Sequence, residues 1–315
     1  MFWKKRGLIF APTPKADWMV THAALPVVWQ RADQSVRVFF CSRDAQGRAQ
    51  IGSFDYDLGT KTVCAISRTP VIGLGALGAF DDNGVTSSCI VEHAGALYQY
   101  FTGWTLGVTV PFYFYIGLAV SYDGGASFTK ISPAPVLGRN PIDPFLTASP
   151  FVLIENGIWR MWYISAARWV LERGAPKHYY HIRYAESRDG IQWQPTGRVC
   201  IDFASESEYA IARPCVIRDG DTYKMWYSSR GTSYRIGYAE SRDGLTWERH
   251  DERAGIDVSA EGWDSEMQAY PYILRDADKL WMFYNGNGYG RTGIGLADLA
   301  LSVADSNTFR EVENK

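Results

Sequence analysis

The sequence lacks the features that mark membrane, secreted or nucleic-acid-binding proteins. Its most apolar run, from Val108 to Val120, contains Pro111 and is too short to span a bilayer. The N-terminal stretch MFWKKRGLIFAP carries charge but no apolar core of the length that a secretion signal needs. No block of lysine and arginine occurs and the net charge is −2, so we expect neither a nucleic-acid nor a membrane partner.

Cysteine is scarce and follows no pattern. The five cysteines are odd in number, are scattered along the chain and contain no CxxC pair, which argues against a disulfide framework. Such a set suits a reducing compartment. We therefore expect a soluble, cytoplasmic protein.

What the sequence does contain is a repeated β unit. The stretch from Arg213 to Trp247 reads as short strands joined by Asp-Gly turns, which are a strong local signal for hairpins. Its last turn, Ser241-Arg242-Asp243-Gly244, has a close copy at Ser187 and a looser one at Ser121. An aromatic strand recurs five times, at Val36–Phe40, Leu97–Phe101, Trp159–Tyr163, Tyr223–Tyr227 and Leu280–Tyr284.

Self-similarity at a period of about 50–65 residues is typical of a propeller or another β array. We therefore expect an all-β fold, a single five-bladed β-propeller over residues 1–315, with four-stranded antiparallel blades around a central axis. Gly7 to Phe10 is expected to form a strand that helps to close the ring. The predicted blades cover residues 22–72, 82–137, 147–199, 208–249 and 266–298.

Strand order decides which residues can meet. In an up-and-down blade, the starts of first strands and the ends of second strands lie on one face of the ring. We expect the acids, arginines and aromatic residues of these segments to converge on an axial pocket. The Ser-x-Asp-Gly turns lie on the opposite face, where their aspartates are interpreted as turn-makers that bond their own backbone.

These features resemble the five-bladed propellers of the arabinanase, levansucrase and invertase superfamily over essentially the full length. The resemblance rests on the five units, the Ser-x-Asp-Gly turns, the Met-Trp-Tyr second strands and the acids before the inner strands. It implies a carbohydrate-active enzyme with carboxylates around the axis. Glu208 best fits the proton donor, Asp82 a second acid and Glu266 a third. The first unit departs from the family pattern, because it opens with Thr21-His22 and its nearest acid is Asp17.

Further candidates come from the same face. Arg213 begins an apolar strand and is expected to face the axis, as a clamp for a sugar hydroxyl, carboxylate or phosphate, or in an ion pair with Glu208 or Glu266. His22 is a candidate proton carrier, phosphate contact or ligand of an axial cation, and otherwise a hydrogen-bonded core residue. No cofactor and no metal cluster is predicted. The candidate sugar contacts are Trp104, Trp169 and Tyr209, together with Asn285 and Asn287.

The function predicted first is cleavage or transfer of a glycosyl unit, with a sugar or glycoconjugate as the partner. Such chemistry needs two carboxyl groups in unlike environments, one protonated and one ionised. Three alternatives stay open. One is a catalytically silent propeller that binds a glycan or nucleotide sugar, which the missing acid beside His22 favours. Another is a phosphorylase, for which Arg43, Arg168 and Arg230 add potential anion donors. The last is a protein-binding propeller. The sugar, the linkage and the oligomeric state stay open as well.

Overall fold

The strands form antiparallel groups that follow one another along the chain. The computed structural model describes residues 2–13, 16–31, 35–276 and 279–301. The first group contains β2 (Thr21–Gln30), β3 (Ser35–Arg43), β4 (Ala49–Asp57) and β5 (Thr62–Ile66). The second contains β6 (Gly84–His93), β7 (Ala96–Leu106), β8 (Phe112–Ser121) and β9 (Thr129–Lys130). In each group, neighbouring strands in sequence are neighbours in the sheet.

The remaining groups have the same arrangement. The third consists of β10 (Thr147–Glu155), β11 (Ile158–Glu172), β12 (Ala175–Ser187) and β13 (Gln194–Ile201). The fourth consists of β14 (Ala210–Asp219), β15 (Thr222–Arg230), β16 (Tyr234–Ser241) and β17 (Glu248–Arg249), followed by a 3-10 turn (Asp251–Arg253). The last consists of β18 (Ala269–Asp276), β19 (Lys279–Asn285) and β20 (Ile294–Ala300), with the short α1 (Asn287–Gly290) before β20.

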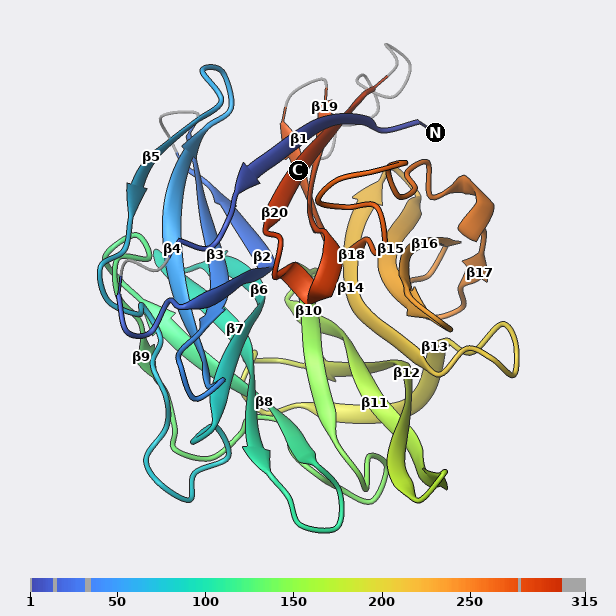
Figure 1. Cartoon of the computed structure of the whole chain (residues 1–315). Coiled ribbons are helices and arrows are strands. Elements are labelled where there is room, and N and C mark those ends of the chain that lie inside the picture. Colours follow the sequence, from blue (N-terminus) through green and yellow to red (C-terminus); the bar gives the residue numbers. More distant parts are fainter. Residues whose placement is uncertain (1, 14–15, 32–34, 277–278, 302–315) are drawn as a thin grey trace.

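The N-terminal strand completes the last group. β1 (Lys4–Phe10) pairs antiparallel with β20, so that strands from both ends of the chain share one sheet. This confirms the closing strand predicted at Gly7 to Phe10. Figure 1 shows the groups around a common centre, with β2, β6, β10, β14 and β18, the inner strands, nearest to it and β5, β9 and β17 at the periphery. The molecule is an all-β propeller.

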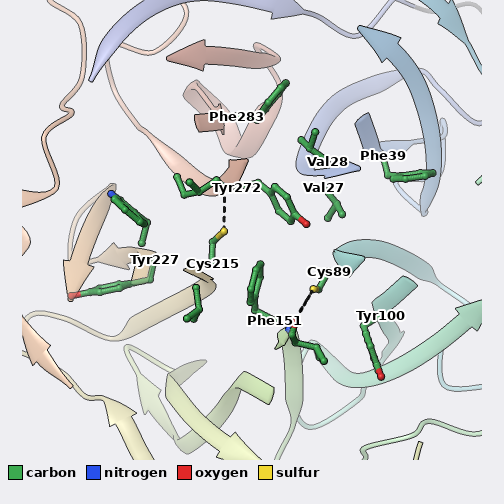
Figure 2. Packing of buried hydrophobic residues seen from close by; sticks show 14 of the residues in the cluster. Val27, Val28, Phe39, Cys89, Tyr100, Phe151, Cys215, Tyr227, Tyr272 and Phe283 are labelled. Atoms are coloured by element: carbon green, nitrogen blue, oxygen red, sulfur yellow. Dashed lines mark hydrogen bonds between the residues drawn. The ribbon is translucent and has the colours of Figure 1, made fainter. Parts of the chain in front are cut away.

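The core lies between neighbouring groups and around the centre. The paired aromatic residues of the second strands, such as Phe39-Phe40 and Trp162-Tyr163, are fully buried. Figure 2 shows residues of the inner strands converging at the centre, among them Val27, Phe151 and Tyr272. Cys89 and Cys215 also lie at the centre. The sulfur of Cys89 accepts the backbone N–H of Val152, and the sulfur of Cys215 accepts that of Ile273, in each case from the next inner strand. All five cysteines are unpaired.

The Ser-x-Asp-Gly turns join neighbouring groups. The carboxylate of Asp189 accepts the backbone N–H groups of Ile191 and Gln192, both at 2.8 Å, and Asp243 bonds its turn in the same way. The carbonyl of Gly244 accepts the indole N–H of Trp162 from the preceding group. These contacts confirm that the turn aspartates are structural.

Candidate functional site

A cavity of about 370 Å³ lies at the centre of the sheets, on the face where the inner strands begin and the second strands end. All five inner strands contribute to its wall, as the strand order predicts. We call it the axial cavity. Its lining consists of His22, Ala24, Leu25, Cys41, Arg43, Ala49, Thr86, Thr102, Trp104, Phe112, Phe114, Ala148, Ser149, Ile164, Tyr180, Ala212, Tyr234, Tyr270 and Tyr289. Pockets of this size are typical of small-ligand sites.

A repeated irregularity of the inner strands shapes the cavity. In four of these strands an alanine, a variable residue and a proline follow one another, and the variable residue has a positive φ: Leu25 (55°), Ser149 (44°), Arg213 (60°) and Tyr270 (60°). The pairing with the second strand shifts register at the same place. Such a bulge turns the variable side chain toward the axis, and the small alanine leaves space beside it.

Aromatic side chains form much of the wall. Phe112 and Phe114 of β8 are stacked at a centroid distance of 4.4 Å, and Trp104 of β7 meets Phe114 edge to face. On the other side, the hydroxyl groups of Tyr180 and Tyr234 are 2.6 Å apart. Flat rings with polar edges offer the kind of surface on which sugars stack.

His22 lies in the wall beside two arginines. Its side chain is buried, and Nδ1 is 2.9 Å from the hydroxyl oxygen of Thr21. Burial, together with the positive charges of Arg43 and Arg291, lowers the pKa of His22 to about 4. The imidazole is therefore neutral at physiological pH. Its cationic neighbours disfavour a bound cation at this position.

Arg213 lies below the cavity and faces the axis, as expected, but its partners are different. Its guanidinium donates to the backbone carbonyls of Pro26, Ser87 and Ser88 at 2.6 to 2.8 Å. Neither Glu208 nor Glu266 pairs with it. Burial lowers the pKa of Arg213 to about 10, because the charged form has lost its hydration. Arg213 thus ties together the two inner strands β2 and β6.

The three acids that the sequence singled out do not line the axial cavity. Glu208 is buried and accepts hydrogen bonds from Arg249, from Ser229 and from the backbone of Ala204. Burial raises the pKa of Glu208, but these donors outweigh it and the net pKa lies below its ordinary value. Asp82 accepts the backbone N–H of Gly78 at 3.0 Å, and Glu266 is exposed. Within the described part of the chain, no aspartate or glutamate contributes to the lining.

The ion pair of Glu208 has counterparts in other groups. A buried acid just before an inner strand binds a basic residue on a strand farther out in the same group. We call these acids the strand-start acids. The pairs are Asp81 with Lys130, Asp143 with Arg183, Glu208 with Arg249 and Asp264 with Lys5. Because the same contact recurs in successive groups, it fixes the loop that enters each inner strand.

Only some of the other predicted sugar contacts line the axial cavity. His22 and Trp104 line the cavity, whereas Trp169 packs behind Phe112 and Tyr209 packs under the guanidinium of Arg230. Asn285 is fully buried and bonds the backbone of Ala23, Leu25 and Gly293. Asn287 accepts the N–H groups of Glu266 and Met267. Both amides hold the backbone near the cavity.

Sequence reasoning missed several residues of the wall. Phe112 and Phe114 lie within the predicted blade 82–137, in an apolar run that is too short to span a bilayer, but neither was named as a site residue although they alternate as strand residues do. Tyr270 could have been found from the repeat, because it stands between alanine and proline as Arg213 does. Tyr180, Tyr234 and Tyr289 carry no such signal.

The described residues contain no group of three or more His, Cys, Asp or Glu side chains that could hold a metal ion. None of the helices in the described ranges has the length and apolar character that a membrane crossing requires.

Comparison with solved structures defines the class of protein. A glycoside hydrolase superposes with a TM-score of 0.75 at 16% identity, covering 95% of this chain and 93% of that one. The β-1,2-mannobiose phosphorylase of Listeria innocua superposes with a TM-score of 0.73 at 10% identity over 100% of both chains. A thermostable family-43 glycoside hydrolase has a TM-score of 0.65 at 15% identity and 91% coverage of each chain. The fold is that of the glycoside hydrolase and phosphorylase propellers, as the sequence resemblance implied for the fold.

Sequence relatives identify the family within this class. Two proteins of Mycobacterium tuberculosis, Uncharacterized protein MT1551 and Uncharacterized protein Rv1502, are each 44% identical to this chain over 301 residues. The matched region covers 95% of this chain and 99% of each relative, so the chain belongs to the family of these mycobacterial proteins. No family model matches it.

Proposed function

We propose that the protein binds a sugar-containing ligand in the axial cavity and does not cleave it with a pair of carboxylates. The observation that carries the proposal is the composition of the wall, which combines aromatic rings, hydroxyl groups, His22 and Arg43 but contains no aspartate or glutamate among the described residues. Hydrolysis by the usual route needs two carboxyl groups about 5–9.5 Å apart around the glycosidic bond. The wall supports binding of a sugar, and its described residues provide neither of these two carboxyl groups.

The propeller fold supports a sugar as the ligand, because its glycoside hydrolase and phosphorylase neighbours share it. The consecutive four-stranded groups likewise support a five-bladed propeller in one domain. On this proposal His22 and Trp104 contact the ligand. We assign Glu208 a structural role, because its carboxylate is fully engaged with Arg249 and Ser229.

Binding is tested by calorimetry and saturation-transfer NMR with a panel of monosaccharides, disaccharides and nucleotide sugars. We expect at least one ligand class to bind, and Tyr289→Ala to weaken its affinity about tenfold through loss of the ring in the wall. Tyr122→Ala is the matched control, since Tyr122 is 84% exposed in a turn on the opposite face. Absence of binding across the panel would count against the proposal.

A second experiment separates binding from catalysis. The wild-type protein is incubated with glycosides of the same sugars, with and without inorganic phosphate. We expect no release of sugar or sugar 1-phosphate. Release that is lost in Asp82→Asn or Glu208→Gln, in protein that stays folded, would restore the carboxylate mechanism.

A further inference from the structure

The ionisable groups at the axial cavity are cationic or neutral. Arg43 lies in the wall, and Arg291 is close enough to His22 to lower its pKa. The guanidinium of Arg230 lies over the rings of Tyr234 and Tyr289, both of which belong to the wall, at 5.4 and 5.3 Å. One guanidinium group therefore lies in the wall and two more lie close to residues of the wall, and the described lining contains no carboxylate.

Arg43 and Arg291 are exposed and Arg230 is partly buried, and all three differ in their partners from three partly buried arginines within the groups. Arg37 pairs with Asp55, Arg160 with Glu155 and Arg249 with Glu208. In the ranges that the structure describes, Arg43, Arg230 and Arg291 form no ion pair with a carboxylate. The guanidinium groups of Arg43, Arg230 and Arg291 are therefore available to an anionic ligand.

Acids on the same face do not neutralise these arginines either. Asp44, next to Arg43, is bound by the side chain and backbone N–H of Arg48 and by the backbone N–H of Gln46. The strand-start acids Glu208 and Asp264 are bound by Arg249 and Lys5. Each of these three carboxylates already has a partner of opposite charge, and no acid of the described ranges forms an ion pair with Arg43, Arg230 or Arg291.

Arg213 adds a positive charge beneath the floor. Its side chain is 2% exposed, it is bonded to carbonyl groups without a carboxylate, and its Nε has no hydrogen-bond partner. A buried charge of this kind is screened less than one at the surface, so it contributes to the potential inside the cavity. The positive groups thus lie both around the mouth and below the floor.

We propose that the ligand of the axial cavity is a phosphorylated sugar, with the phosphate held by Arg43 and Arg291 and the sugar ring against the aromatic wall. This inference rests on the proposed function and names its ligand class. A phosphate monoester carries about −1.5 to −2 charges at neutral pH and three acceptor oxygens, which suit several guanidinium groups better than one carboxylate does. Arg230, over the rings of Tyr234 and Tyr289, adds a third positive charge on the aromatic side of the wall.

The test compares neutral sugars with their phosphates. Calorimetry is carried out with glucose, mannose and galactose, with the 1-phosphate and the uronic acid of each, and with inorganic phosphate. We expect the phosphate of a bound sugar to bind at least about tenfold more tightly than the neutral sugar. In the double substitution Arg43→Gln with Arg291→Gln we expect this advantage to disappear, so that the sugar phosphate binds no more tightly than the neutral sugar does to the same variant. Arg188→Gln, an exposed arginine in a turn on the opposite face, leaves both affinities unchanged.

A second readout uses inorganic phosphate alone. The ring signals of His22 are followed by NMR during a phosphate titration, and we expect them to shift in the wild type and in Arg188→Gln but not in the double variant. A lipid-linked source of the phosphosugar is distinguished by vesicles with and without a glycolipid whose sugar carries a phosphate monoester. Binding to the loaded vesicles alone would assign the ligand to a lipid headgroup, and binding of the soluble phosphate would assign it to a free metabolite.

The outcomes separate the two proposals. Equal affinity for a neutral sugar and its phosphate would overturn the phosphosugar inference and leave sugar binding intact. Equal affinity for the phosphate and the uronic acid would also overturn it, in favour of a general anion site. Failure of sugars, sugar phosphates and inorganic phosphate alike to bind would overturn both.

Discussion

Individual carboxylates in this protein have roles that depend on their partners. Glu208 stands just before an inner strand and was expected to be a proton donor, yet it is one of four acids that each bind a basic residue in the same group. An ionised acid with such partners is not available as a proton donor. The recurrence of this ion pair in successive groups indicates a structural contact.

Glu208→Gln tests this role through stability. Because the pKa of Glu208 is lowered in the folded protein, ionised Glu208 stabilises the fold above its ordinary pKa, and this contribution is lost as the pH falls through the lowered pKa. We expect the variant to lose about 2 kcal/mol of unfolding free energy near neutral pH, and the difference to shrink in acid. Urea unfolding of the wild type and the variant across a pH series measures this difference in unfolding free energy.

Glu266→Gln is the matched control, because Glu266 is exposed, and should change stability by less than about 0.5 kcal/mol. A Glu208→Gln protein as stable as the wild type near neutral pH would show that the ion pair with Arg249 contributes nothing. Sugar affinity should be the same in both variants.

At the scale of single elements, the bulges of the inner strands decide the shape of the cavity. Ser149 in β10 has a φ of 44°, whereas Ser88 stands at the corresponding place in β6 without a positive φ. Both contact Thr102: the backbone N–H of Ser149 donates to its hydroxyl oxygen, and the hydroxyl oxygen of Ser88 lies 3.2 Å from it. The two serines form a matched pair.

Glycine should therefore have opposite effects at these positions. Ser149→Gly removes the strain of a left-handed side-chain residue, which is about 1 kcal/mol, and keeps the backbone bond to Thr102. We expect it to be at least as stable as the wild type. Ser88→Gly loses its hydroxyl contact and adds chain entropy to the unfolded state, so it should lose about 1 kcal/mol or more. Chemical denaturation compares them; equal losses would show that the bulge carries no strain.

For the molecule as a whole, β1 connects parts that are distant in sequence. It pairs with β20 of the last group, and Phe10 at its end packs against Phe54 of the first group at a centroid distance of 4.3 Å. Just before β1, Trp3 is 2% exposed and packs edge to face on Trp226 of the fourth group. The N-terminal segment thus contacts three groups.

Trp3→Ala is expected to destabilise the whole propeller by about 3 kcal/mol, because it leaves a cavity between groups. The neighbouring Phe2 is 84% exposed, and Phe2→Ala should change the stability by less than about 0.5 kcal/mol. Thermal and urea unfolding of the two variants provide the comparison. A loss that is equally small in both would mean that the N-terminal segment does not stabilise the ring.

The all-β class, the repeated units, the second strands, the turns and the closing strand could all be predicted from the sequence. Each is encoded locally, because alternation of side chains and the hydrogen bonds of an Asp-Gly turn involve residues a few positions apart. Asp189 and Asp243 illustrate this, since their partners lie two and three residues further on.

The set of side chains that meet at the axis could not be predicted from the sequence and is seen only in the folded protein. Phe112 and Tyr180 reach the cavity from different groups, while Glu208 and Asp82, which precede inner strands, are held away from it by bonds within their own loops. Arg213 is likewise bound to carbonyls of strands more than a hundred residues away in sequence. This is because the position of a residue along the chain does not specify the direction in which its loop or bulge points the side chain. That direction follows from packing and hydrogen bonds between groups, which exist only in the folded protein.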